Sequence, residues 1–221
     1  MKKKIVFLIT LLFVVVGYTI VSKKDSLKKY QKRRDFTKSP EPSGKKEKPI
    51  KKKIFVIQKH DATKLHYDFR LAIEGVLVSW AVPKGPSLNP TEKRLAIPTD
   101  DHPLSYAKFE GIIPKGNYGA GTVMVWDTGT YENIKTKDGK IVPMKKCLKN
   151  GQIEVFLKGK KLQGGFALVK MKGQEQWLLI KTRDKYASAK KNPVNTQTKS
   201  IITDRTMAQI AKDADKIASC K

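Results

Sequence analysis

The stretch His66–Val82, which reads HYDFRLAIEGVLVSWAV, decides the fold of this chain of 221 residues. It holds two runs rich in branched and aromatic side chains, Tyr67–Ile73 and Val76–Val82, separated only by Glu74 and Gly75. A two-residue loop that ends in glycine is typical of a tight β-hairpin, because glycine accepts the positive φ angle that such a turn requires. The stretch therefore predicts two antiparallel strands.

Short runs of Val, Ile, Phe, Trp and Leu continue on both sides of this hairpin, separated by Gly, Pro, Asn and Asp. Runs of this length are typical of an all-β domain rather than of alternating strands and helices. We predict further strands at Ile54–Gln58, Thr122–Asp127, Gln152–Leu157, Phe166–Lys172 and Gln176–Lys181. Together they predict a mainly β fold, arranged as a barrel or a sandwich.

Composition divides the chain into four segments. We expect an apolar segment at residues 1–22, a basic extended arm at 23–53, the β domain at 54–186, and a linker with a C-terminal helix at 187–221. The accessory helix is expected at 205–219, where apolar side chains recur at helical spacing: Met207, Ile210, Ala211, Ala214 and Ile217.

Residues 5–22 form an uncharged, largely apolar run of 18 residues, the lower limit for spanning a bilayer. No good small-x-small cleavage site follows, so we expect an uncleaved transmembrane helix rather than a signal peptide, with secretion left open. Three lysines precede the run and eight Lys or Arg follow it by residue 38. This charge bias predicts an anchored protein whose domain faces the cytoplasm; a buried helix or a wrong start codon is the alternative.

The chain carries a formal net charge of +26, from 46 Lys and Arg against 20 Asp and Glu. Such a balance favours a polyanionic partner, with nucleic acid first and an anionic membrane surface second, although a biased genome composition would also produce it. The basic arm would grip phosphates or serve only as a solvated linker. The two cysteines, Cys147 and Cys220, lie far apart, which argues against a thiolate zinc site or a disulfide scaffold.

The three histidines of the chain are His60, His66 and His102. The strand period of two places His66, Asp68 and Arg70 on one polar face. With His60 from the preceding loop, two imidazoles and a carboxylate form a donor set that suits Mn²⁺ or Zn²⁺ and leaves positions for a phosphate oxygen. Arg70 would bind that phosphate. The alternatives are ordinary, partly exposed histidines and a salt bridge between Arg70 and Asp68.

The loop Asp100–Tyr106 holds a histidine and a phenol that would approach phosphate oxygens. His102 would also donate a proton to a leaving alkoxide, since the pKa of imidazole lies near neutrality. Simple core packing is the alternative for Tyr106.

The segment Phe109–Gly121 is rich in glycine but does not match a P-loop or a dinucleotide-binding pattern, so we interpret it as turn structure with Glu110 as an uncertain member of the site. Lys84 and Arg94 flank a turn segment rich in proline. They are candidate phosphate contacts, or ordinary surface residues.

These motifs resemble the signature of the 3′-phosphoesterase module of bacterial DNA ligase D. The resemblance rests on His60–Leu71, on Asp101-His102-Pro103 with Tyr106, and on Phe109–Pro114. It extends along much of the chain, to Arg34–Phe36, Ser39–Pro42, Trp126–Glu132 and Trp177–Lys181.

The resemblance implies a compact antiparallel β-barrel that removes a 3′-terminal ribonucleoside and then a 3′-phosphate from DNA, leaving a 3′-hydroxyl for repair of double-strand breaks. It implies a manganese ion held by His60, His66 and Asp68. It also implies phosphate contacts from the side chains Arg70, His102, Tyr106, Lys84 and Arg94, and supporting roles for Asp35, Glu41, Asp100 and Glu110.

Asp100 stands where the family usually has Glu, which would weaken a supporting contact. The sequence contains no polymerase or ligase module, although Arg205–Ala211 resembles the segment that leads into the ligase. We therefore expect a free-standing version that works with a separate ligase and polymerase. Two alternatives stay open: a non-catalytic module that binds DNA ends or RNA through the basic arm, and a membrane-surface protein.

Overall fold

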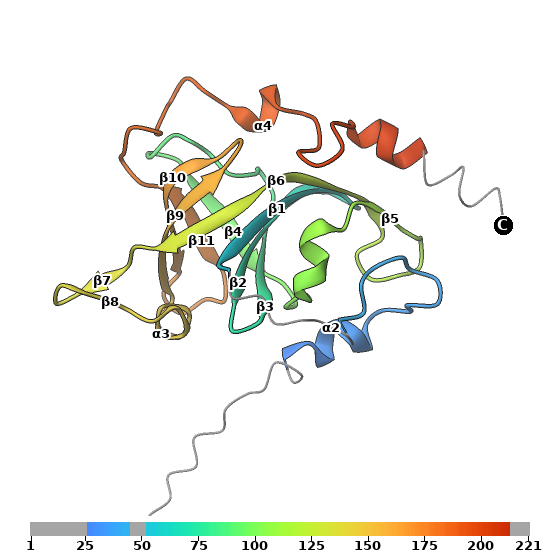
Figure 1. Ribbon diagram of the computed structural model, residues 1–221, viewed down its shortest axis with the longest axis horizontal. Helices are drawn as coiled ribbons and strands as arrows, with labels where there is room; N and C mark the ends of the chain where they lie inside the picture. The colour runs from blue at the N-terminus through green and yellow to red at the C-terminus, as the bar shows by residue number, and fades with distance from the viewer. Residues whose placement is uncertain (1–25, 45–51, 213–221) are drawn as a thin grey trace, which may run out of the picture.

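The computed structural model describes residues 26–44 and 52–212. Eight strands close into an antiparallel barrel in the order β1-β2-β3-β4-β11-β10-β9-β6, with β6 pairing back onto β1 and β5 added at the edge of β6 (Figure 1). The bounds are β1 (Ile54–Asp61), β2 (Leu65–Ile73), β3 (Val76–Val82), β4 (Lys93–Pro98), β5 (Gly111–Ile113), β6 (Gly121–Asn133), β9 (Gln152–Gly159), β10 (Gln163–Lys170) and β11 (Trp177–Lys181). The predicted mainly β barrel is confirmed.

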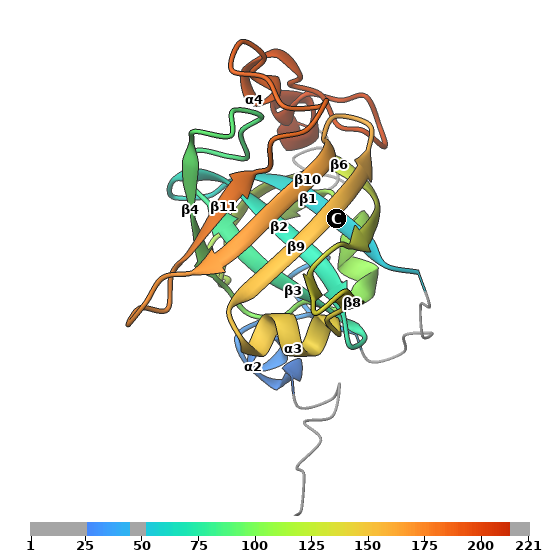
Figure 2. The same ribbon diagram turned by 90° about the vertical axis from the view of Figure 1, so that its left-hand side faces the viewer.

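The remaining elements are short. They are the helices α2 (Lys28–Lys32), α3 (Met144–Lys149) and α4 (Pro193–Thr196), the 3-10 helix η1 (Leu104–Lys108), and a small hairpin of β7 (Thr136–Lys137) and β8 (Lys140–Ile141). Figure 2 shows α4 and the C-terminal segment at one end of the barrel, and α2 and α3 toward the other.

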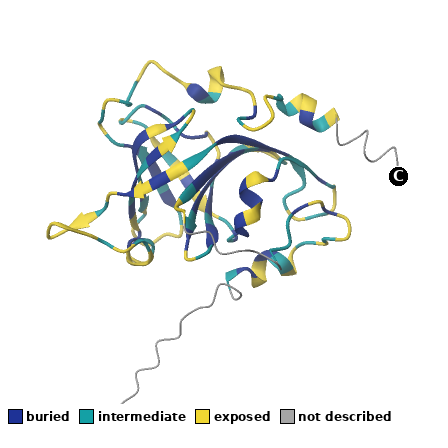
Figure 3. Ribbon diagram, in the orientation of Figure 1, coloured by how far each residue is buried: buried dark blue, intermediate teal, exposed yellow. Residues whose placement is uncertain are grey.

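The barrel strands bury side chains on both faces where η1 and α2 cover them. Phe69 and Leu71 of β2 belong to the interior core, whereas Val56 of β1 belongs to a second apolar cluster outside the barrel wall. That second cluster includes Tyr30 of α2 and Tyr106 of η1. Figure 3 shows this covered region as dark blue ribbon between the barrel and the helices. The polar face of β2 is therefore covered by η1 and α2.

Several strand boundaries differ from the prediction. The strand β1 continues to Asp61, so His60 lies on a strand rather than in a loop. The strands β4 and β5 were not predicted. In β4 only Ala96 is buried and Leu95 and Ile97 are exposed, so its sequence lacks the buried apolar alternation that identifies a strand.

The expected extended arm is helical at α2 and folds onto the barrel. Leu27 and Tyr30, spaced three residues apart on one helix face, are both buried. The hydroxyl of Tyr30 donates a hydrogen bond to the carbonyl of Pro42 at 2.7 Å. The prediction of a mobile arm is wrong for residues 26–44 because these apolar anchors were masked by the surrounding lysines.

The expected membrane anchor is corrected. Among residues 26–44 and 52–212, no helix is long and apolar enough to cross a bilayer. Residues 5–22, on which the anchor was predicted, lie outside the described part of the chain. We therefore do not retain the predicted transmembrane helix. The predicted localisation, anchored in a membrane and facing the cytoplasm, depended on that helix and is not retained either.

The C-terminal segment packs on the barrel rather than acting as a free linker. The indole nitrogen of Trp126 donates to the carbonyl of Gln197 at 2.6 Å. Residues 207–212 are helical, and Ile210 is buried in the interior core cluster. The predicted accessory helix is confirmed for these residues, and the rest of it lies outside the described chain.

Candidate active site

Two neighbouring strands bring the three predicted metal donors together. In the antiparallel pairing of β1 with β2, His60 lies directly opposite His66, and Asp68 follows two residues later on the same face. The Oδ2 atom of Asp68 lies 3.5 Å from Nδ1 of His60 and 3.7 Å from Nε2 of His66. All three ligand atoms lie within 4.8 Å of one another, close enough to hold one ion.

Backbone carbonyls decide which imidazole nitrogens face the cluster. Nε2 of His60 lies 2.9 Å from the carbonyl of Gly119, and Nδ1 of His66 lies 2.8 Å from that of Lys64. A carbonyl only accepts, so each of these nitrogens carries the proton and leaves the other with a lone pair. The lone pairs then point at the Asp68 carboxylate. Acceptors that converge without a proton between them fit a divalent cation.

Arg70 forms the wall beside these donors. Its Nη2 atom lies 3.0 Å from Oδ2 of Asp68, so the ion pair considered as an alternative role is present. Burial would raise the pKa of Asp68, but its charged surroundings, above all the Arg70 guanidinium, outweigh burial and hold that pKa well below its usual value. Asp68 is therefore ionised at neutral pH, as a metal ligand must be.

Gln58, which the sequence analysis did not identify, fixes Arg70. Its side-chain oxygen accepts from Nε of Arg70 at 2.8 Å, and its amide donates to the carbonyls of Tyr106 and Phe109 at 3.1 and 2.9 Å. Gln58 is fully buried and lies opposite Asp68 in the β1–β2 register. A glutamine directly after the apolar run Ile54–Ile57, two residues before His60, was the available signal. Ser79 completes the support, since its hydroxyl lies 2.9 Å from Nη1 of Arg70.

His102 packs between the barrel wall and the arm. Its Nδ1 lies 2.7 Å from the Asp100 carbonyl and 2.9 Å from Nη1 of Arg70, and its Nε2 lies 3.2 Å from Nη2 of Arg34. Because Arg34 only donates, Nε2 accepts from it, so Nδ1 carries the proton and donates to the Asp100 carbonyl instead of accepting from Arg70. Burial, Arg70 and Arg34 all lower the pKa of His102 well below its usual value, so the imidazole is neutral at pH 7.

Tyr106 is buried on η1, and its hydroxyl donates to Oε1 of Glu41 at 3.1 Å. Burial, followed by the charge of Glu41, raises the pKa of this phenol well above its usual value. Arg34 in turn contacts the same Glu41 oxygen at 2.9 Å. Glu41, for which the resemblance implied a supporting role, thus contacts Tyr106 and Arg34. The hydroxyl of Tyr106 is inside the structure rather than at its surface.

The loop before His102 ties the arm down by charge. The buried carboxylate of Asp100 lies 3.2 Å from both Arg33 and Lys29 of the arm. Next to it, burial and the charge of Asp100 raise the pKa of Asp101 to about 6. Although Asp100 is shorter than the Glu that the family usually has at this position, its carboxylate still pairs with both Lys29 and Arg33.

Four other predicted residues are not among those that line the cavity at the metal donors. Lys84 is exposed, and Arg94 pairs with Glu92. Asp35 is also exposed and bonds to its own neighbour Thr37. Glu110 accepts from the backbone of Val125 at 3.1 Å and from Arg205 at 3.0 Å. That carboxylate ties the C-terminal segment to the barrel instead of lining the site.

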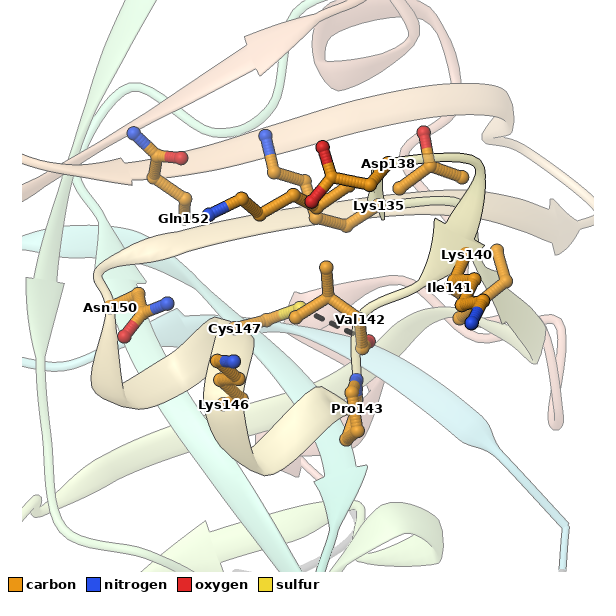
Figure 4. Close-up of a pocket in the computed structure, with 12 residues that line it drawn as sticks. Lys135, Asp138, Lys140, Ile141, Val142, Pro143, Lys146, Cys147, Asn150 and Gln152 are labelled. Carbon is orange, nitrogen blue, oxygen red and sulfur yellow. Dashed lines mark hydrogen bonds between the residues drawn. The ribbon is translucent and has the colours of Figure 1, made fainter.

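The donor cluster opens into a cavity of about 260 Å³ lined mainly by the residues already described. A larger cavity of about 590 Å³ lies between the β7–β8 hairpin and α3 (Figure 4). It is lined by four lysines and by Cys147, whose thiol donates to the carbonyl of Val142 at 3.4 Å. Among the described residues, His60, His66 and Asp68 are the group that could hold a metal, and they line the smaller cavity.

Comparison with known proteins agrees with this geometry. Residues 58–170 match the model of the DNA ligase D 3′-phosphoesterase domain. The chain is 42% identical over 188 residues to the multifunctional non-homologous end joining protein LigD of Pseudomonas aeruginosa, which covers 82% of this chain and 22% of that protein. It is 45% identical over 160 residues to the multifunctional non-homologous end joining DNA repair protein LigD of Mycobacterium tuberculosis, covering 70% of this chain and 19% of the relative.

The chain thus spans about a fifth of the length of these curated relatives. The matched region begins at Gln58 and includes the metal donors, Arg70, His102 and Tyr106. The arm that carries Arg34 and Glu41 precedes it. On the match of the domain model to half of its residues, the chain belongs to the DNA ligase D 3′-phosphoesterase family, a family of DNA repair end-processing domains.

Proposed function

We propose that this protein is a metal-dependent DNA 3′-end-healing phosphoesterase that removes 3′-terminal ribonucleosides and 3′-phosphates and leaves a 3′-hydroxyl. The observation that carries the proposal is the convergence of His60, His66 and Asp68 within 4.8 Å, in one cavity with Arg70 and His102. Recognition of a phosphate alone would not require two imidazole lone pairs aimed at one carboxylate.

The residues present fit a divalent transition metal. His60 and His66 would supply neutral nitrogen donors and Asp68 an ionised oxygen donor, a set that suits Mn²⁺, with Zn²⁺ as the alternative. When bound, such an ion would act as a Lewis acid on a phosphate oxygen. Gly119 and Lys64 keep the two imidazoles in the required tautomer through their carbonyls.

The side chains around the donors would hold the ester. Arg70 is fixed by Gln58 and Ser79, so its guanidinium is oriented before any substrate arrives. His102 is neutral in this environment because two guanidinium groups and burial lower its pKa. A phosphate placed beside these groups would add negative charge, raise that pKa, and let His102 donate a proton to the leaving oxygen. Tyr106, whose phenol stays protonated, would donate its single O–H to the phosphate in place of Glu41.

DNA 3′ ends are the proposed substrate, as part of a primer–template. The net charge of +26 supports a polyanionic partner, and the relatives are named as non-homologous end joining proteins. The resulting 3′-hydroxyl would be used by a polymerase and a ligase, which we propose as functional partners.

The deciding experiment incubates the purified full chain with a primer–template that ends in one ribonucleotide, with Mn²⁺, with Zn²⁺ or with chelator, and resolves the products at single-nucleotide length. Wild type is expected to release the ribonucleoside and then the phosphate only with metal. His66→Ala and Asp68→Asn are expected to lose at least about 100-fold in rate. His66→Ala should keep the melting temperature, whereas Asp68→Asn should lower it because the buried Arg70 loses its anionic partner. Asp61→Asn, which changes an exposed carboxylate of the same strand, is the matched control.

Product formation by His66→Ala and Asp68→Asn at the wild-type rate would overturn the proposed site. The second candidate function is a non-catalytic module that binds DNA ends or RNA. It is favoured by the position of Arg34, which occupies Nε2 of His102. Tight binding of the primer–template by wild type without any release of product, in either metal, would support that candidate instead.

A further inference from the structure

Tyr118 is an exposed aromatic side chain at the opening of the active-site cavity. It lines that cavity together with the metal donors, yet 48% of its surface is exposed. The other aromatic side chains of this region behave differently, since Tyr30 and Tyr106 are buried in the apolar cluster outside the barrel wall. Core packing therefore does not account for Tyr118.

The backbone fixes Tyr118 relative to the donors. Gly119, the next residue, accepts the hydrogen bond from Nε2 of His60 at 2.9 Å. Two turns hold the loop, since Asn117 donates to the carbonyl of Pro114 at 3.2 Å and Ala120 to that of Asn117 at 3.1 Å. A ligand held at the donors would thus meet the Tyr118 ring at a set distance.

Two arginines of the arm lie beside the ring. The guanidinium carbon of Arg33 lies 4.8 Å from the centroid of Tyr118, and that of Arg34 lies 5.5 Å from it. An aromatic face next to guanidinium groups is the arrangement by which proteins hold single-stranded nucleic acid, with the ring stacking on a base and the cations attracting the backbone.

We propose that Tyr118 forms a nucleobase subsite, on which the base of the 3′-terminal nucleoside stacks while its phosphate lies at the donors. The proposal rests on the proposed function and adds the group that the enzyme recognises beyond the phosphate. Any of the bases would be accepted, because stacking uses the flat face that all bases share.

The competing explanation is that Tyr118 only anchors the arm through the two guanidinium groups. A substrate without a terminal base separates the two explanations. One primer–template would end in an ordinary nucleoside 3′-phosphate, and the other in a tetrahydrofuran residue that carries the same 3′-phosphate but no base. Loss of arm anchoring would affect both substrates equally, whereas loss of stacking would affect only the first.

Wild type is expected to show a KM about 5- to 150-fold lower for the substrate with the base, the ratio that corresponds to stacking of one base on an aromatic ring. Tyr118→Ala is expected to abolish this ratio and to keep the wild-type kcat and KM on the baseless substrate. Tyr118→Trp is expected to retain or enlarge the ratio. Melting temperatures would check that all three proteins are folded. Equal losses on both substrates, or a wild-type ratio near one, would overturn the subsite.

A binding measurement keeps the inference testable without turnover. A primer–template with 2-aminopurine as its 3′-terminal base would be titrated with each protein, because stacking quenches the fluorescence of this base. Quenching by wild type and by Tyr118→Trp, but not by Tyr118→Ala, supports the subsite. If wild type hydrolysed neither substrate, the proposed function would fail while the quenching still decided the subsite. Absence of quenching by wild type would overturn it.

Discussion

The protons of two imidazoles are committed to backbone carbonyls, and this commitment prepares His60 and His66 for a cation. Nothing in the side chains themselves would choose the tautomer. Gln58 orients Arg70 in a similar way, since its side-chain amide accepts from the guanidinium and also donates to two carbonyls of the η1 region. The chemistry of the centre thus depends on neutral polar groups that would never touch the substrate.

Replacement of Gln58 by Ala tests this dependence. The variant leaves Nε of Arg70 and the Phe109 carbonyl without this partner, while the Tyr106 carbonyl keeps the N–H of Phe109. Each unsatisfied buried group costs about 1–3 kcal/mol. We expect a loss of at least about 2 kcal/mol in the free energy of unfolding and a fall in kcat that persists after the metal is saturated. Urea denaturation and primer-end assays would measure both. Wild-type activity in a folded Gln58→Ala protein would contradict the role assigned to this residue.

Asp101 gives a prediction about pH. Burial and Asp100 raise its pKa to about 6, above the usual value for a carboxyl group, so the native state holds this proton more tightly than the unfolded state. Ionisation therefore destabilises the native state, and stability falls as pH rises from about 4 through 6. Asp101→Asn is expected to be more stable than wild type at pH 7.5 and to lose that advantage at pH 4. Urea denaturation at the two pH values would measure this, and an equal difference at both would contradict it.

The arm, residues 26–44 with helix α2, covers one side of the site. Arg34 contacts Nε2 of His102 and Glu41 accepts from the hydroxyl of Tyr106, so these two residues join the arm to the barrel side of the site. They also form an ion pair with each other, and their side chains are 3% and 0% exposed. Loss of Arg34 would remove the contact to His102 and leave the buried Glu41 carboxylate without its cation, which is costly because no water surrounds that charge. The arm should therefore leave the barrel when Arg34 is removed.

Arg34→Ala is expected to release this arm. The barrel should remain folded because its interior core does not include Arg34, whereas residues 26–44 should become cleavable and end-processing activity should fall by about 10-fold or more. Limited trypsin digestion followed by mass spectrometry would locate the cuts. Arg33→Ala is the matched control, since its side chain is 40% exposed and Lys29 still pairs with Asp100. Equal protection of the arm in both variants would contradict the prediction.

Strand alternation was enough to predict a mainly β domain and the shared face of His66, Asp68 and Arg70, because period two follows from the backbone alone. It left a barrel and a sandwich open, and the barrel was implied by the family resemblance. It was not enough to predict α2, whose apolar anchors are dispersed among lysines, or β4, whose side chains are largely exposed. The basic residues Lys84 and Arg94 could not be ranked, because they are two of 46 Lys and Arg in the sequence. Contacts between distant segments, such as Arg34 with His102, leave no local pattern.

The entire molecule behaves as a polycation. A net charge of +26 predicts that DNA binding displaces many counterions, so affinity should fall steeply with salt. We expect a loss of at least about 1,000-fold in affinity for a primer–template between 50 and 200 mM KCl, the range for a protein that contacts about six or more phosphates. Fluorescence anisotropy would measure it, with an uncharged solute at matched osmolality as the control. A flat response would show that the charge is not used for binding.

The pairing register of β1 with β2 fixes the spacing of the side chains in the site. His60 faces His66, Gln58 faces Asp68, and Val56 faces Arg70, and successive pairs on one face are about 6.5 Å apart along the strands. A single inserted residue would turn every one of these side chains to the opposite face. Single insertions or deletions in these strands therefore cannot adjust the distance between the metal donors and Arg70 without losing the site. New substrate preferences in such a protein would have to arise from its loops and its arm, while the register of β1 and β2 stays the same.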